Sequence, residues 1–158
     1  MPEVRKMQNG EHPRLRLKQF LPYRLSVLSN RISRAIADHY EARFSLTMPE
    51  WRVMAILGEE PGLSAGQVSE RTAMDKVAVS RAVGRLLKSG RLNRSFHKGD
   101  RRRSVLVLSE AGEKVYEQVV PLAVRYEEAL LDGLTEVEKM HLDETLNKLA
   151  ELEHELPG

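Results

Sequence analysis

A stretch in the middle of the chain, residues 64–112, constrains the fold more than any other part. Ser64 and Gln67 have the spacing of a helix capping box, which predicts a short helix directly after Ser64. After a short turn, Asp75 is a suitable N-cap for a second helix that extends to about Ser89. This arrangement predicts a helix-turn-helix, in which the second helix enters the major groove of DNA.

The second predicted helix has an apolar stripe and an opposite face that is available to DNA. The stripe consists of residues at helical spacing, which are Val79, Val83, Leu86 and Leu87. Side chains off the stripe face outward, and the predicted DNA-binding set among them is Lys76, Val77, Ala78, Ser80, Arg81 and Arg85. Arginine and serine reach base edges or phosphates, lysine at a helix start contacts phosphate, and small apolar side chains contact thymine methyl groups.

Two short runs, residues 92–97 and 103–108, predict a β-hairpin with a basic tip. The tip between them is Lys98, Gly99, Asp100, Arg101 and Arg102. A hairpin placed directly after a recognition helix is the wing of a winged helix, and a tip this basic suits phosphate or minor-groove contact. Ser109 then follows as the predicted N-cap of another helix.

Two motifs in this region resemble those of the MarR family, the multiple-antibiotic-resistance regulators. Residues 100–112 resemble the wing signature D-x-R…L-[TS]-x-x-G, and residues 87–94 are similar to L-x-x-x-G-[LI]-[IV]-x-R. Arg91 departs from the second motif, because an apolar residue is usual there, and we expect it to loosen packing at the first wing strand. The resemblance implies a two-fold dimer formed by interlocking terminal helices.

The resemblance also assigns roles to residues of the wing. It places Arg102 in the minor groove, where Asp100 would hold its guanidinium by a charge-assisted hydrogen bond. Lys98, Arg101 and Arg103 belong to the same basic tip, and the two arginines are expected to contact phosphates.

Charge is segregated along the chain although the formal net charge is only +2. Residues 71–103 contain eleven Lys and Arg against two Asp, which leaves +9, whereas residues 104–158 contain four against thirteen acidic residues, which leaves −9. A solvated charged surface explains scattered charge well and segregation poorly. The basic block on the predicted reading element therefore indicates double-stranded DNA as a partner.

Long amphipathic helices are predicted over residues 22–44, from Gly112 to about Leu131, and from Thr135 to about Glu155. One small domain cannot bury all their stripes, so a homodimer is predicted, with an intramolecular bundle as the alternative. The predicted fold is mainly α with a small β-hairpin wing. Its parts are a mobile N-terminal arm (1–19), a helical dimerisation region (20–46 and 109–158) and a winged helix-turn-helix DNA-binding domain (47–108).

Four residues form a candidate ligand site, and they are His39, Tyr40, Arg43 and Trp51. The resemblance implies a small aromatic or phenolic acid that binds between the dimer helices and the winged helix and releases DNA. A cationic group beside aromatic rings suits such a carboxylate. The alternative is that these residues are structural, and for Trp51 a place in the core is favoured.

Several classes of protein are disfavoured by what the sequence lacks. It contains no cysteine, no metal-ligand spacing among its five histidines, no nucleophile elbow and no Gly-rich phosphate loop, so no enzyme, metal or cofactor is predicted. It has no apolar run long enough to span a bilayer and no signal peptide, which predicts a cytoplasmic protein.

The sequence thus predicts a ligand-responsive transcription regulator that represses by binding a pseudo-palindromic operator as a homodimer. Two other functions fit the same fold. One is an architectural DNA-binding protein without an effector, and the other is an adaptor that uses the winged helix to bind another protein.

Overall fold

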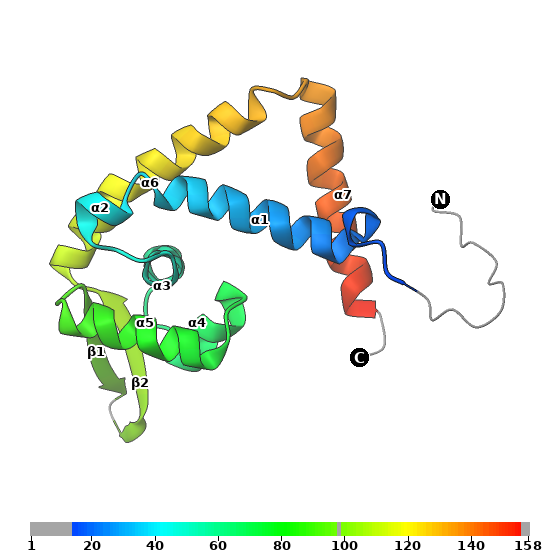
Figure 1. The fold of residues 1–158 in the computed structure, drawn as a ribbon. Coiled ribbons are helices and arrows are strands. Elements are labelled where there is room, and N and C mark those ends of the chain that lie inside the picture. Colours follow the sequence, from blue (N-terminus) through cyan, green and yellow to red (C-terminus); the bar gives the residue numbers. More distant parts are fainter. Residues whose placement is uncertain (1–13, 98, 156–158) are drawn as a thin grey trace. The chain divides into compact units, whose positions relative to one another are not determined.

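The computed structural model describes residues 14–97 and 99–155 and separates into two units, residues 1–35 and 36–158 (Figure 1). The chain is mainly helical with one two-stranded antiparallel sheet, which confirms the predicted fold class. Its elements are η1 (Leu17–Gln19), α1 (Leu21–Ala37), α2 (Glu41–Phe44), α3 (Met48–Glu59), α4 (Ala65–Thr72), α5 (Lys76–Lys88), β1 (Leu92–His97), β2 (Asp100–Leu108), α6 (Glu110–Leu131) and α7 (Glu136–Glu155).

The first unit contains η1 and most of α1. Of the predicted N-terminal arm, residues 1–13 lie outside the described residues, and residues 14–19 are exposed. The apolar stripe predicted for α1 is present but remains largely uncovered, since Leu21, Leu25 and Leu28 are 44%, 41% and 56% exposed. A stripe of exposed apolar side chains is typical of a surface that binds a partner.

The helix predicted over residues 22–44 is not continuous, so that prediction was wrong. α1 ends at Ala37, and α2 begins at Glu41. In the turn between them, the His39 amide donates to the Ile36 carbonyl at 3.1 Å and the Tyr40 amide donates to the Ala37 carbonyl at 3.0 Å. At the end of the turn, Tyr40 has φ −121° and ψ −22° and is completely buried, with its ring against that of Trp51. The burial of Tyr40 is a tertiary contact, which apolar spacing along one helix does not reveal.

Three capping boxes start helices where the sequence predicted them: Thr47 with Glu50 before α3, Ser64 with Gln67 before α4, and Thr135 with Glu138 before α7. In each box, the backbone amide of the N-cap residue donates to the side-chain oxygen of the Glu or Gln three residues later, at 2.8 to 2.9 Å. The backbone amide of that Glu or Gln donates in turn to the N-cap hydroxyl, at 3.2 to 3.4 Å. The hydrogen bonds from Thr135 lower the pKa of the exposed Glu138 carboxyl.

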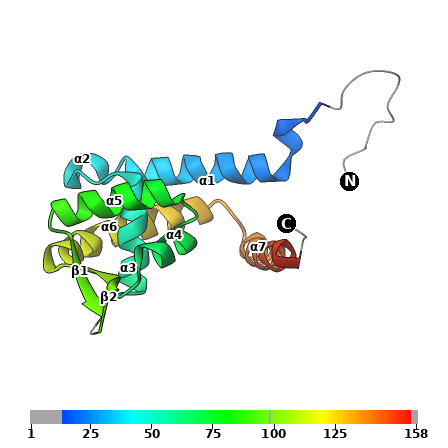
Figure 2. The ribbon, with the colours of Figure 1, turned by 90° about the horizontal axis from the view of Figure 1, so that it is seen from below.

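The core of the second unit is built around α3, which contacts α4, α5, β2 and α6 (Figures 1 and 2). Its buried side chains Val53, Met54 and Leu57 meet Val68 of α4 and Leu86 of α5. All five are at most 1% exposed. This core holds the helix-turn-helix on a rigid base.

The hairpin is confirmed, but its second strand starts earlier than predicted. β2 begins at Asp100 rather than Arg103, and the pairing changes from Phe96 with Ser104 to His97 with Asp100. Gly99, at φ +103°, allows the tight turn that brings Asp100 opposite His97. The loop is therefore shorter than the predicted five-residue tip, because residues 100–102 extend the strand.

A third segment joins the base of the hairpin. Leu63 forms an isolated antiparallel bridge with Leu106, through bonds of 2.8 Å from the Leu106 amide to the Leu63 carbonyl and 2.9 Å from the Gly62 amide to the Leu106 carbonyl. Leu63 and Leu106 are both buried. The bridge fixes the hairpin to the segment that precedes α4, so the helix-turn-helix and the wing share one base.

The last two helices carry apolar side chains that are also uncovered. Val137, Met140 and Leu146 of α7 are 57%, 52% and 47% exposed. Within the described part of the chain, no helix has both the length and the apolar character needed to cross a membrane. The predicted dimerisation role of residues 20–46 and 109–158 remains a prediction.

Candidate nucleic-acid interface

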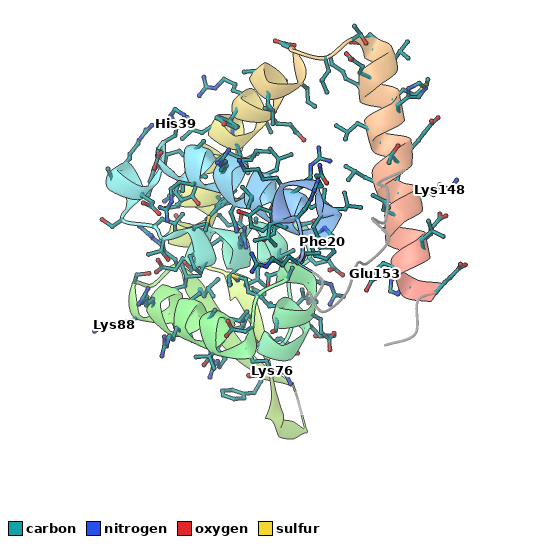
Figure 3. All side chains as sticks on the ribbon, turned by 45° about the vertical axis from the view of Figure 1, so that its right-hand side comes forward. Phe20, His39, Lys76, Lys88, Lys148 and Glu153 are labelled. Carbon is teal, nitrogen blue, oxygen red and sulfur yellow. The ribbon has the colours of Figure 1, made fainter. Side chains whose placement is uncertain are left out.

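α5 separates its side chains onto two faces, as predicted. Val79, Ala82, Val83 and Leu86 are buried, and Leu87 is half-buried. The predicted DNA-binding residues lie outside that face: Lys76, Val77, Ser80, Arg81 and Arg85 are exposed, and Ala78 is intermediate. Lys76 and Lys88 lie at the two ends of the helix (Figure 3). The exposed face presents small side chains between cationic ones, the composition that a groove-binding helix requires.

The turn between α4 and α5 sets the direction of this face. Ala73 ends α4 in the left-handed region, at φ +51°, so the chain reverses within three residues. Asp75 then caps α5 by accepting from the Ala78 amide at 2.8 Å. The Ser69 hydroxyl donates to the Met74 carbonyl at 3.2 Å and braces the turn from the preceding helix. The predicted helix-turn-helix is thus confirmed together with its capping residue.

The wing presents one exposed aromatic residue that the sequence analysis missed. Phe96 of β1 is 57% exposed, and it follows Leu92 and Arg94 on the same face of the strand. Leu92 is buried in the core and Arg94 is exposed, so this face leaves the core toward the tip. The alternation of Leu92, Arg94 and Phe96 in the sequence was the available signal.

The basic tip is described only through its backbone. Lys98 lies outside the described residues, and Asp100, Arg101, Arg102 and Arg103 have a described place in β2 but no described side-chain positions. Their predicted contacts with DNA, and the orienting role of Asp100, remain predictions.

Of the candidate ligand residues, Tyr40 is buried, Trp51 is half-buried, and the other two are exposed. The rings of Tyr40 and Trp51 lie 5.9 Å apart, and Trp51 is also 5.9 Å from Tyr116 of α6. His39 and Arg43 are exposed. The His39 ring lies 6.4 Å from that of Tyr126 on α6. Tyr40 therefore lies in the core with Trp51 packed against it, and the ligand-binding role of the four residues remains a prediction.

Arg43 reaches α6 through its side chain. It donates to the Gln118 amide oxygen at 3.1 Å, and its guanidinium lies 5.0 Å from the centre of the Phe44 ring. Across the described ranges, no cluster of three or more His, Cys, Asp or Glu side chains could hold a metal ion.

A helix-turn-helix that shares its core with a hairpin wing defines a winged helix-turn-helix domain. Residues 44–103 match the model of the MarR family. HTH-type transcriptional regulator BilQ of Clostridium symbiosum is 32% identical over 93 residues, so the match spans 59% of this chain and 65% of that relative. Residues 44–103 are thus similar to the MarR family, and the relatives named here are described as transcriptional regulators.

Solved structures are similar to the chain beyond the matched segment. A MarR/EmrR family transcriptional regulator from Acinetobacter sp. ADP1 has a TM-score of 0.80 at 27% identity, over 90% of this chain and 100% of that one. BpsR of Bordetella bronchiseptica, described as regulated in its DNA binding by 6-hydroxynicotinic acid, has a TM-score of 0.74 over 88% of this chain and 98% of its own. Because its identity is only 22%, that likeness is one of fold.

Proposed function

We propose that this chain is a sequence-specific DNA-binding repressor that acts as a homodimer. The observation that carries the proposal is the exposed face of α5, where Arg81 and Arg85 stand beside the small residues Ala78 and Ser80. Because the opposite face is buried in the core, only this face is available to a partner. The charge of +9 over residues 71–103 favours a polyanion, and similarity to a family of transcriptional regulators supports DNA.

Two variants test which residues of α5 contact bases and thereby set sequence preference, and which contact phosphates and set only affinity. Selection from a random DNA pool first supplies the preferred site. Arg81→Ala should cost about 1–3 kcal/mol at that site and relax sequence preference at one position, because bidentate base contacts discriminate by that amount. Lys76→Ala should weaken binding to all sequences and reduce the salt slope by about one ion. If both variants lose the same affinity for the selected site as for random DNA, Arg81 does not contact bases as proposed.

The wing is proposed to enter the minor groove through Arg102. Arg102→Ala should reduce operator affinity by about tenfold, roughly 1.4 kcal/mol, with thermal stability nearly unchanged. Asp100→Ala separates two explanations, since the variant is more cationic than the parent. Charge attraction alone predicts tighter binding, whereas loss of an orienting partner predicts weaker specific binding. Tighter specific binding would leave Asp100 no orienting role.

Two competing functions give different outcomes in the same assays. An architectural protein should bind the selected site and a scrambled version of it with similar affinity. An adaptor should have no DNA affinity at moderate salt. Repression itself is tested with a reporter whose promoter contains the selected site, where expression should fall when the protein is present. A rise in expression would identify an activator.

The homodimer is supported by the uncovered apolar residues of α1 and α7. Leu146→Glu places a charge among them and should shift the protein toward monomer or unfolded material in sedimentation experiments. Lys148→Glu, two residues away and also exposed (Figure 3), is the matched control and should remain a dimer. A parent protein that sediments as a stable monomer would overturn the proposal.

An aromatic-acid effector is proposed to act near His39 and Arg43, the two exposed candidates. 6-Hydroxynicotinate, the compound named for BpsR, is a suitable probe because it joins a carboxylate to an aromatic ring. It should raise the melting temperature and weaken operator binding, and Arg43→Gln should reduce both effects. If hydroxylated benzoates and this compound leave both measurements unchanged, this class of effector is excluded.

A further inference from the structure

Arg91 departs from the family pattern, and the structure gives it contacts that an apolar residue cannot make. Its guanidinium Nη2 donates to the backbone carbonyl of Phe44, the last residue of α2. It does not loosen the first wing strand as expected, since the adjacent Leu92 is only 3% exposed. Arg91 thus joins two elements that are separated by 47 positions in the chain.

The backbone of Arg91 is held on two sides. Its amide donates to the Leu86 carbonyl of α5 at 2.9 Å, and its carbonyl accepts from the Ser109 amide at 3.0 Å. Gly112 of α6 approaches so closely that a Cβ there would overlap the Arg91 carbonyl oxygen. The peptide group that leads into β1 is therefore fixed between the end of α5 and the start of α6.

The side chain of Arg91 meets a short element that is also held by Arg43, which donates to Gln118 of α6 at 3.1 Å, and by Phe44, which packs against the core. α2 has only four residues, so its terminal carbonyls lack partners within the helix. Ser45 follows at φ +47°, which turns the chain away directly after Phe44. In the described ranges no helix or strand packs extensively against α2. The bond from Arg91 is thus one of the contacts that hold the C-terminal end of α2, and it is the one that leads to the wing.

We infer that Arg91 is a positioning residue that ties the C-terminal end of α2 to the base of the wing. α2 and α5 both lie on the left of the second unit in the two views, and the hairpin projects downward from the base of the domain (Figures 1 and 2). If α2 moves, the hydrogen bond from the Arg91 guanidinium to Phe44 transmits the movement to Arg91, which directly precedes the first residue of β1. The functional consequence of this inference rests on the proposed DNA binding, but the structural link between Arg91 and α2 can be tested without DNA.

The first experiment measures amide hydrogen exchange in the full-length protein. Arg91→Leu should accelerate exchange by about fivefold or more in two separate segments, residues 41–46 and 92–97, without affecting α3. The apolar residue usual in the family supports folding of this variant, and Arg91→Lys should restore much of the protection because its ammonium is also a donor. Acceleration throughout α3, or in neither segment, would overturn the inference.

The second experiment measures affinity for the selected DNA site over a range of salt concentrations. Arg91→Leu should weaken binding by about five- to tenfold with an unchanged salt slope, because its guanidinium is occupied by a carbonyl rather than a phosphate. Arg125→Leu, which removes an equal charge from α6, is the control and should change affinity less than about twofold. A salt slope reduced by about one ion would make Arg91 a phosphate contact and overturn the inference.

The two experiments distinguish failure of the inference from failure of the proposed function. If the parent protein binds no DNA site, the proposed function fails while hydrogen exchange still tests the tie. If the parent binds its site and Arg91→Leu alters neither exchange nor affinity, the inference fails and the proposed function stands.

Discussion

Gly112 lies where α6 crosses the base of the wing, and replacing it with alanine should be strongly destabilising. A Cβ at this position would overlap the Arg91 carbonyl oxygen, lie 3.1 Å from the carbonyl carbon and lie 3.4 Å from a Leu108 methyl group. Two of these three atoms belong to the backbone, so no rotamer change relieves the overlap. The start of α6 must instead move away from Arg91.

The loss of unfolding free energy can be estimated from the contacts that this movement of α6 disturbs. Overpacking of this kind typically costs about 1–3 kcal/mol. Movement also strains the bond from the Ser109 amide to the Arg91 carbonyl and the bond from the Ser109 hydroxyl to the Gly90 carbonyl, worth roughly 1 kcal/mol each. The higher helix propensity of alanine offsets up to about 1 kcal/mol of this loss. We therefore expect Gly112→Ala to lower the free energy of unfolding by about 2–4 kcal/mol.

Urea unfolding followed by circular dichroism measures this change, at one fixed protein concentration because the proposed dimer makes stability depend on it. Gly84→Ala is the matched control. Gly84 lies within α5, and a Cβ there would meet nothing within 4 Å. That variant should gain about 0.5–1 kcal/mol. A Gly112→Ala protein as stable as the parent would refute the steric argument.

Three further predictions follow from other contacts. Gly58→Ala should destabilise the protein by about 1–3 kcal/mol and change the fluorescence of the only tryptophan, because the new Cβ would displace the Tyr116 ring. Asp75→Ala should cost about 1 kcal/mol of unfolding free energy in urea titrations, since it removes the N-cap of α5. The lowered pKa of Glu138 means that its stabilising contribution is present above its ordinary pKa and is lost as the pH falls through the lowered value. Protection of the Thr135 amide should therefore fall on acidification, and Glu138→Gln should abolish that pH dependence in exchange measurements.

Local signals in the sequence were sufficient for most of the secondary structure. Capping boxes, the N-caps Asp75 and Ser109, and the apolar spacing of α5 were enough, because each depends on residues within a turn or two of one another. The same spacing separated the buried face of α5 from the exposed face that carries Arg81. The family resemblance could also be read from the sequence, since its motifs are contiguous.

Only the tertiary structure decided the features that depend on residues far apart in the chain. The break before α2 accompanies the burial of Tyr40 against Trp51, the bridge of Leu63 to Leu106 adds a third segment to the hairpin, and Arg91 bonds to a carbonyl 47 positions away. Helical periodicity contains no information about such contacts, because it reports which face of an element is apolar and not which distant group meets it. The exposed face of α5 was thus set by its own sequence, whereas its attachment to the wing was set by packing.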